Sequence, residues 1–382
     1  MKFIILLFLF PFVLLANVNY MSDYNKELAL LESLDIEPSF LYDPLMENIR
    51  ISNSSEDKNK YFFDAFDSAY LFIPTIKNIL VKNGIPKEFL YLAMTESNFS
   101  TKAHSNKKAA GLWQFMPATA KDYGLKINTY VDERRDLIKS TKAAAKFLNQ
   151  LHKQFGKWYL AAIAYNCGAG RLSRAIKRAH SDDIRVLLDE KKKYIPRESR
   201  NYIRKIVAFA LMGNDEEFLL SSRYEHLLNV ANTYNVTTLS LPAGVSLAYL
   251  ADILEMPLKE LKKLNRHLRY GFVPPNVKSY SVYIPYEKLS LFKRRYENKK
   301  IRNFYYVHEV KSGENLSVLA KRYGVPYKAI MRFNHLKTSF LRIKQKLIIP
   351  VVKKVAFSKR ERKRKRKRER KRDMNYYVRN EI

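Results

Sequence analysis

The 382-residue sequence predicts a mainly α fold, in which one large helical domain precedes two small α+β modules of order strand, helix, helix, strand. Two observations support this class. Residues 61–220 carry apolar side chains at helical spacing and show no run of alternating strands, and an internal repeat begins beyond residue 220. The length, with 47% hydrophobic residues, is sufficient for two or three packed domains.

The first twenty residues predict export. A Lys at position 2 precedes an apolar run over 3–15, and Ala16 and Asn17 follow it. Such a run is short for a membrane span and has the form of a secretory signal, so we expect residues 1–16 to be a signal peptide. An uncleaved signal that associates the chain with the membrane is the alternative. No Cys follows the run, so no lipid anchor is expected there, and no other stretch is long and apolar enough to cross a bilayer. The expected location is the periplasm or cell envelope.

Residues 17–60 predict a polar, weakly structured lead-in, and residues 61–220 predict almost continuous helix. The stretch "STKAAAKFLNQLHKQFG" illustrates the helical pattern, because its apolar residues share one face. Ser140 or Thr141 is expected to cap this helix at its N-terminus, and Gly156 is expected to end it.

The charge is strongly unbalanced. There are 70 Lys and Arg against 37 Asp and Glu, a net charge of +33, which indicates an anionic partner. The stretch 359–372 alone holds 12 basic and two acidic residues, so we expect 352–382 to be a disordered basic tail. Because an exported chain does not meet nucleic acid, we expect no nucleic-acid partner, and assign the tail to an anionic wall or membrane surface. A merely solubilising tail is the alternative.

An internal repeat relates residues 243–265 to residues 312–334 at a constant offset of 69. Seven positions match, among them Gly244 with Gly313 and Asn265 with Asn334. Each copy closes with a strand-like run ending in Pro, "YSVYIP" or "KLIIP", and the second also opens with the strand-like "FYYVHEV". Two copies are too few for a solenoid, so two separate modules are expected, over 221–300 and 301–351. The first copy lacks an evident opening strand.

One carboxylate lies on an apolar face. In "YLAMTESNFS" (91–100), a helical wheel places Glu96 between Leu92 and Ala93 and close to Phe89. Most glutamates near a helix end simply reach solvent. The alternative is a desolvated carboxyl with a raised pKa, which can act first as a general acid and then as a general base.

The sequence around Glu96 decides between these readings. It continues "ESNFSTKAHSNKKAAGLWQFMPATAKDYGL" (96–125), and "DERRD" (132–136), "AAIAYNCGAGRL" (161–172) and "YIPRESRNYIRKIVA" (194–208) follow. These blocks, in this order, resemble the lysozyme-like catalytic domain of the soluble-type lytic transglycosylases. The combination with the repeat resembles the D type of membrane-bound lytic murein transglycosylase, which adds C-terminal LysM modules. The resemblance is strong over 61–220 and 304–350 and weak over 221–300.

The resemblance implies a fold, a substrate and a set of site residues. It implies a lysozyme-like domain that acts on peptidoglycan glycan strands, with Glu96 as the catalytic acid/base. The residues that it implies for the sugar cleft are Ser97, Ser105, Gln114, Met116, Tyr165, Asn166 and Tyr202. The sequence departs from the family at Lys108, where Gly is frequent, and at Cys167, where a small residue is usual.

The chemistry that follows uses one carboxyl group. The resemblance implies that Glu96 protonates the glycosidic oxygen between MurNAc and GlcNAc, that the sugar's N-acetyl group assists, and that the sugar's 6-hydroxyl then closes a 1,6-anhydro ring. Asp132, Glu133 and Asp136 are candidates for a second carboxylate, but the neighbouring Arg134 and Arg135 favour structural salt bridges. A hydrolytic muramidase on the same fold and a non-catalytic wall-binding protein remain as alternatives.

The second module resembles a LysM domain, and the resemblance implies that Gly313, Asn315 and Asn334 contribute to sugar binding. The first module is expected to be a degenerate copy without sugar affinity. The seven His are scattered without a ligand pattern, so neither a metal nor a cofactor is expected.

Overall fold

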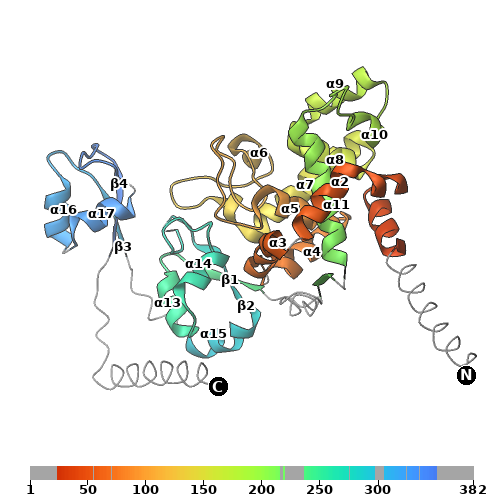
Figure 1. Ribbon diagram of the computed structural model, residues 1–382. Coiled ribbons are helices and arrows are strands. Elements are labelled where there is room, and N and C mark those ends of the chain that lie inside the picture. Colours follow the sequence, from red (N-terminus) through yellow and green to blue (C-terminus); the bar gives the residue numbers. More distant parts are fainter. Residues whose placement is uncertain are drawn as a thin grey trace, which may run out of the picture. The chain divides into compact units, whose positions relative to one another are not determined.

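The computed structural model describes residues 24–54, 56–69, 71–215, 218–219, 236–274, 276–296, 305–323, 325–334 and 336–350. The chain divides into two compact units, Met1–Lys299 and Lys300–Ile382 (Figure 1). The predicted class is confirmed: the first unit is helical over most of its length and ends in one strand–helix–helix–strand module, and the second unit contains another. The predicted signal, 1–16, and the basic tail, 352–382, lie outside the described residues.

The N-terminal segment is helical and packed, so the expected weakly structured lead-in is wrong for residues 24–54. A helix covers residues 24–33, and η1 (Pro38–Tyr42), α2 (Pro44–Ser54) and α3 (Glu56–Ala69) follow. Leu31, Phe40 and Met46 are almost fully buried in the main core. The polar composition predicted a weakly structured segment because single apolar residues are separated by polar ones. A helix can nevertheless pack when only one of its faces is apolar.

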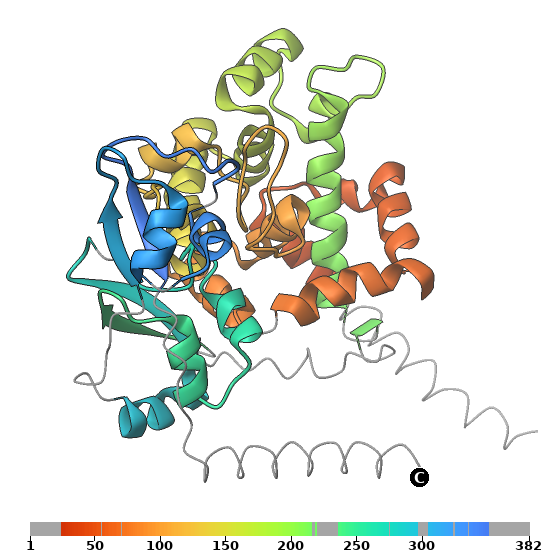
Figure 2. The same cartoon turned by 90° about the vertical axis from the view of Figure 1, so that its left-hand side faces the viewer.

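Residues 73–214 of the first unit form packed helices joined by turns and by longer loops around α6 (Figure 1). Their elements are α4 (Ile73–Lys82), η2 (Lys87–Phe89), α5 (Leu90–Ser97), α6 (Pro117–Asp122), η3 (Glu133–Arg135), α7 (Leu137–Phe155), α8 (Trp158–Cys167), α9 (Ala169–Ala179), α10 (Ile184–Leu187) and α11 (Arg197–Asn214). The long helix α11, green in Figure 2, packs against α2, α5 and α8 and is buried along most of its length. It therefore connects the N-terminal helices to the elements that carry the sequence motifs.

The N-cap of α7 lies four residues before Ser140, the first of the two expected caps. Asp136 is its N-cap and accepts hydrogen bonds from the backbone N–H groups of Ile138 (3.1 Å) and Lys139 (2.8 Å). An Asp side chain at this position satisfies two of the free N–H groups of the first turn. Ser140 and Thr141 lie inside the helix instead. The predicted end is confirmed, because Gly156 has φ +75° at the C-cap.

The first small module, residues 236–295, contains a strand that the sequence did not reveal. Strand β1 (Val236–Pro242) pairs antiparallel with β2 (Ser279–Pro285), in register Val236↔Pro285 to Pro242↔Ser279. Between them lie α13 (Leu247–Ile253) and α14 (Leu258–Leu264), and η5 (Tyr286–Lys288) and α15 (Leu289–Arg295) follow. In "VTTLSLP" the alternation is imperfect, but Val236, Leu239 and Leu241 are buried.

The second unit contains the same arrangement with its own core. Strand β3 (Tyr305–Glu309) pairs antiparallel with β4 (Lys346–Pro350), and α16 (Leu316–Tyr323) and α17 (Tyr327–Phe333) lie between them. Leu316, Leu319, Ile330, Leu347 and Ile349 form the centre of the core. Across the described part of both units, no helix is both long and apolar enough to span a membrane.

Candidate active site

Glu96 lies in the last turn of α5, a helix whose preceding residues are buried. Phe89, Leu92 and Ala93 are at most 1% exposed, so the apolar face expected around the carboxyl is present. The helix stops directly after it, because Asn98 adopts a left-handed conformation (φ +51°) and its N–H donates to the carbonyl of Met94 at 2.7 Å. The carboxyl therefore lies at a helix end, between a dry interior and an accessible side.

Burial raises the pKa of Glu96 from 4.5 to about 7. The hydrogen bond from Tyr202 acts in the opposite direction, and the charge of Glu198 adds to the increase. Desolvation thus dominates, as expected for a carboxyl on an apolar face. A group with this pKa is populated in both protonation states near neutral pH, which is what a residue that acts as both acid and base requires.

Two tyrosines surround the carboxyl. The Tyr202 hydroxyl on α11 donates to Glu96 Oε1 at 2.6 Å, and burial raises the Tyr202 pKa well above its ordinary value, so the phenol stays protonated. Burial, with the charge of Glu96, does the same for Tyr165 on α8. Because Oε1 accepts the Tyr202 hydrogen bond, Oε2 carries the proton of the neutral acid. One oxygen is held in place and the other is left for proton transfer.

A compact turn over residues 103–116 lies against this site. Short antiparallel bridges pair Ala110 with His104 and with Phe115. The Ser97 hydroxyl donates to the carbonyl of Leu112 at 2.8 Å, and the Tyr165 hydroxyl donates to that of Trp113 at 2.7 Å. Ser97 and Tyr165 therefore tie the turn to the helices that carry and surround Glu96.

Three predicted cleft residues lie on this turn or at its end. Gln114 has φ +45° and donates from Nε2 to the carbonyl of Gly111 at 2.7 Å, while Met116 is 44% exposed. Ser105 accepts from the backbone N–H of Ala109 at 3.0 Å and so closes a tight turn. Lys108, where the family often has Gly, adopts φ +70°, a conformation that Gly takes without a side-chain penalty. The departure thus keeps the backbone path of the turn.

The remaining motif residues lie where α8 meets α11. Asn166 Oδ1 accepts a hydrogen bond from the hydroxyl of Ser199 at 2.6 Å, which orients its amide. Cys167 is half-buried, and burial raises the pKa of its thiol. Sequence reasoning missed Ser199 and also Glu198, whose charge acts on Glu96. The spacing from Glu198 to Tyr202, one helical turn on α11, was the available signal.

The three acids of "DERRD" have structural partners. Asp132 pairs with Arg134 at 2.8 Å, and Glu133 pairs with Lys139 at 2.6 Å. Burial disfavours their ionisation, but the hydrogen bonds and charges of these partners outweigh it and hold the pKa of each carboxyl below its usual value. Asp136 caps α7. Within the described residues, no group of three or more His, Cys, Asp or Glu is arranged to hold a metal ion.

In the second unit, the predicted sugar-binding residues have structural roles. Asn334 donates from Nδ2 to the carbonyls of Ile330 (2.8 Å) and Ile348 (2.7 Å) and accepts from the N–H of Ile348 at 2.7 Å. Both N–H donors of its amide are therefore used within the module, and its contribution to sugar binding stays a prediction. Asn315 caps α16 by accepting from the N–H of Val318, and Gly313 has φ +80°; both are exposed.

Comparison with known families agrees with this layout. The Transglycosylase SLT domain matches residues 74–188, and the LysM domain matches residues 308–350. Residues 235–301 match the "Lytic transglycosylase MltD, LysM-like domain". The first match includes Glu96, Gln114 and Tyr165, and the two others coincide with the two small modules.

Among curated proteins, membrane-bound lytic murein transglycosylase D of Escherichia coli K12 is 29% identical over 324 residues, which cover 79% of this chain and 69% of that protein. Peptidoglycan transglycosylase gp16 of Escherichia phage T7 is 36% identical over 131 residues, 34% of this chain and 9% of that protein.

Among solved structures, the soluble lytic transglycosylase SLT70 of E. coli is 20% identical with a TM-score of 0.30, covering 53% of this chain and 29% of that one. Lytic transglycosylase Slt of Pseudomonas aeruginosa is 23% identical with a TM-score of 0.31, covering 41% and 24%. This chain thus spans less than a third of either solved chain. From the sequence matches, the chain is a homologue of membrane-bound lytic murein transglycosylase D, with a transglycosylase SLT domain followed by LysM-type domains.

Proposed function

We propose that this protein is a peptidoglycan lytic transglycosylase that cleaves the MurNAc–GlcNAc β-1,4 bond and leaves 1,6-anhydro-MurNAc ends. The observation that carries the proposal is the environment of Glu96. Its pKa of about 7 and the hydrogen bond from Tyr202 to Oε1 suit one carboxyl for both proton transfers. The match of residues 74–188 to the Transglycosylase SLT domain and the homologous membrane-bound lytic murein transglycosylase D support the same reaction class.

Glu96 begins the reaction as a neutral acid. Its Oε2 proton passes to the glycosidic oxygen as the C1–O bond breaks, and the N-acetyl oxygen of MurNAc stabilises C1. The carboxylate then removes the proton from the 6-hydroxyl as that oxygen bonds to C1, which restores the acid. No water is consumed. Tyr202 holds the carboxyl throughout, and the site needs no cofactor for these steps.

The remaining cleft residues are proposed to position the sugar. Met116 offers an exposed apolar surface, and the Asn166 amide is oriented by Ser199. Gln114 and Ser105 frame the turn that lies against Glu96, through the hydrogen bonds described above. These contacts would convert binding energy into orientation of the scissile bond.

The hydrolytic alternative keeps one observation in its favour. Glu198 is an exposed carboxylate whose charge acts on Glu96. If it activated a water molecule, the product would carry a reducing end.

Mass spectrometry of the fragments released from purified sacculi separates the two reactions. We expect products lighter by one water than the corresponding reducing sugars. Reducing ends that incorporate oxygen from ¹⁸O-labelled water would instead establish a muramidase, and a Glu198→Gln variant would then lose activity.

We also propose that the protein acts in the cell envelope after export and binds the wall through its C-terminal parts. Exposed Asn315 and Gly313 remain candidates for sugar contact, and the basic stretch 359–372 for anionic wall or membrane surfaces. Truncations ending at Val355 and Asn303 separate these contributions in pelleting assays with sacculi. At low salt both should bind less than the full chain.

Near 0.5 M salt only the shorter chain should remain impaired, because screening at this salt removes the contribution of exposed charges. Loss of all binding on removal of the tail alone, at every salt concentration, would contradict sugar binding by residues 308–350.

A further inference from the structure

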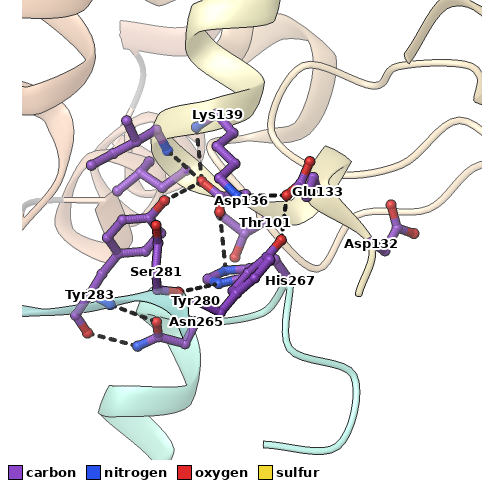
Figure 3. A network of polar contacts seen from close by, with 12 residues as sticks. Thr101, Asp132, Glu133, Asp136, Lys139, Asn265, His267, Tyr280, Ser281 and Tyr283 are labelled. Atoms are coloured by element: carbon purple, nitrogen blue, oxygen red, sulfur yellow. Dashed lines mark hydrogen bonds and ion pairs between the residues drawn. The ribbon is translucent and has the colours of Figure 1, made fainter. Parts of the chain in front are cut away.

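The first LysM-like module is joined to the catalytic domain by buried polar contacts (Figure 3). From β2, the Tyr280 hydroxyl donates to Glu133, and the Tyr283 hydroxyl donates to Asp136 Oδ1 at 2.7 Å. Burial and the neighbouring acids raise the pKa of both phenols, so both remain donors. Both acids belong to the "DERRD" segment. Tyr283 also belongs to the main hydrophobic core of the catalytic domain.

Backbone pairing extends this contact. The N–H of Asp132 donates to the carbonyl of His267 at 3.0 Å, and the N–H of Arg269 donates to that of Tyr130 at 3.0 Å. Between them, Val131 and Leu268 form an antiparallel bridge, and both side chains are at most 4% exposed. The module therefore holds the backbone of residues 130–132 on one side.

The two copies of the repeat differ at this loop. This loop joins the second helix to the closing strand, between α14 and β2 in the first module and between α17 and β4 in the second. Phe340 and Ile343 are 75% and 63% exposed in the second unit. In the first module the same loop packs against the catalytic domain, so its role differs from that of its counterpart.

On the other side, the "DERRD" segment holds the turn 103–116. Arg134 binds both oxygens of Asp132, at 2.9 and 2.8 Å, and donates from Nη1 to the carbonyls of Lys108 (2.7 Å) and Phe115 (3.2 Å). One guanidinium thus holds the turn at two points, near its middle and near its C-terminal end. Gly111 lies so close to the Arg134 carbonyl that a Cβ would be 1.9 Å from its oxygen.

Residues 103–116 also contact the Glu96 site, through the hydrogen bonds of Ser97 and Tyr165. A continuous set of buried and partly buried contacts therefore runs from the module through "DERRD" and the turn to the catalytic helix. All of its members are described residues of one compact unit.

We propose that residues 236–295 brace the catalytic cleft: by fixing the "DERRD" segment they hold Arg134, and Arg134 acts as a positioning residue that keeps the turn 103–116 against Glu96. The module works through the catalytic site and not as a separate binding domain. This inference rests on the proposed function for its kinetic test. A contiguous set of contacts becomes a functional coupling only if a perturbation at one end is felt at the other.

The test uses the full chain with Tyr280→Phe and Tyr283→Phe, singly and together, which remove two hydroxyls and retain the rings. Tyr286→Phe is the matched control, because Tyr286 follows the same strand and is 58% exposed. Hydrogen–deuterium exchange of residues 103–116 is measured first, since it requires no activity. We expect residues 103–116 to exchange faster in the double variant than in the wild type, and at the wild-type rate in the control.

The kinetic readout is the pH profile of kcat/KM on soluble peptidoglycan fragments. If the turn loosens, water reaches Glu96 and its pKa falls, so the alkaline limb should move to lower pH by roughly half a unit or more. We expect kcat to fall about tenfold or more from misplacement of the cleft. Arg134→Lys should shift the limb in the same direction, whereas Arg185→Lys, at an exposed arginine on α10, should not.

Each outcome bears on the brace. A lower fraction of folded enzyme would reduce the amplitude of the profile without moving its limb. An unmoved limb together with unchanged exchange over 103–116 in the double variant overturns the proposal, and the single variants decide it if the double variant does not fold. If the wild-type enzyme cleaves nothing, the proposed function fails, and the exchange data still test the brace.

Discussion

Replacing Glu96 by Gln should inactivate the enzyme and, above neutral pH, stabilise the fold. In the wild-type protein the pKa of this carboxyl is about 7, against an ordinary value of 4.5. The folded state therefore binds the Glu96 proton more tightly than the unfolded state does. Wild-type stability consequently falls as pH rises from about 4.5 to about 7, and it is independent of this group outside that window.

The magnitude follows from the two pKa values. At 1.36 kcal/mol for each pH unit between 4.5 and about 7, ionised Glu96 costs the fold on the order of 3 kcal/mol at pH 8.5. The Gln variant has no charge to desolvate, and its amide oxygen can still accept from Tyr202. Relative to wild type, it should gain about 3 kcal/mol in free energy of unfolding between pH 4.5 and pH 8.5.

Urea denaturation followed by tryptophan fluorescence measures this difference. The two tryptophans of the chain, buried Trp113 and half-buried Trp158, both lie in the catalytic domain, so the signal reports that domain. Glycan cleavage by the same variant should fall by at least about 10²-fold, since one group performs both proton transfers. An equal stability difference at the two pH values would refute the desolvated carboxyl, and retained activity would refute its catalytic role.

Three further substitutions test the surroundings. Tyr202→Phe removes the hydrogen bond that lowers the Glu96 pKa, so the alkaline limb of kcat/KM should move to higher pH; a shift downward would contradict the assigned contact. Gly111→Ala places a Cβ against a backbone carbonyl at a residue with φ +80° and should destabilise the domain by about 2–4 kcal/mol. Gly124→Ala is the control: its φ is +82°, no atom lies near the added Cβ, and the cost should be about 1–2 kcal/mol. Asn334→Ala should destabilise the second unit by about 1–3 kcal/mol, because it removes both side-chain hydrogen bonds to the backbone of Ile348. Circular dichroism of the full chain at low urea concentration measures this loss, and an unchanged unit would contradict the structural role of Asn334.

The sequence was most informative where one residue's position carries a physical requirement. Glu96 was predictable because a helical wheel places it on an apolar face, and the structure gives its pKa the expected direction. Gly156 was predictable because a helix often ends at a Gly with positive φ. The strand–helix–helix–strand order followed from the repeat and its closing Pro residues.

The sequence was least informative where a residue's role depends on a distant partner. Asp136 became a helix cap and a partner of Tyr283, 147 positions away, which no local pattern indicates. Strand β1 was missed because it acquires its pairing only against β2. Helices of the lead-in were missed because Phe40 and Met46 bury against residues beyond position 60. Tertiary contacts, and not local propensity, decided each of these cases.

The repeat shows how one local design serves two purposes. Asn265 and Asn334 make the same hydrogen bonds, each donating to a carbonyl on the preceding helix and exchanging two bonds with the closing strand. These hydrogen bonds explain why both copies have Asn at this position, since backbone groups of the closing strand would be costly to bury without a partner. The difference lies on the outer surface of each copy, where one loop carries Phe340 in solvent and the other carries Leu268 against the catalytic domain. A repeat in sequence therefore predicts the same module twice, while the partner of each copy is decided by the few side chains outside its core.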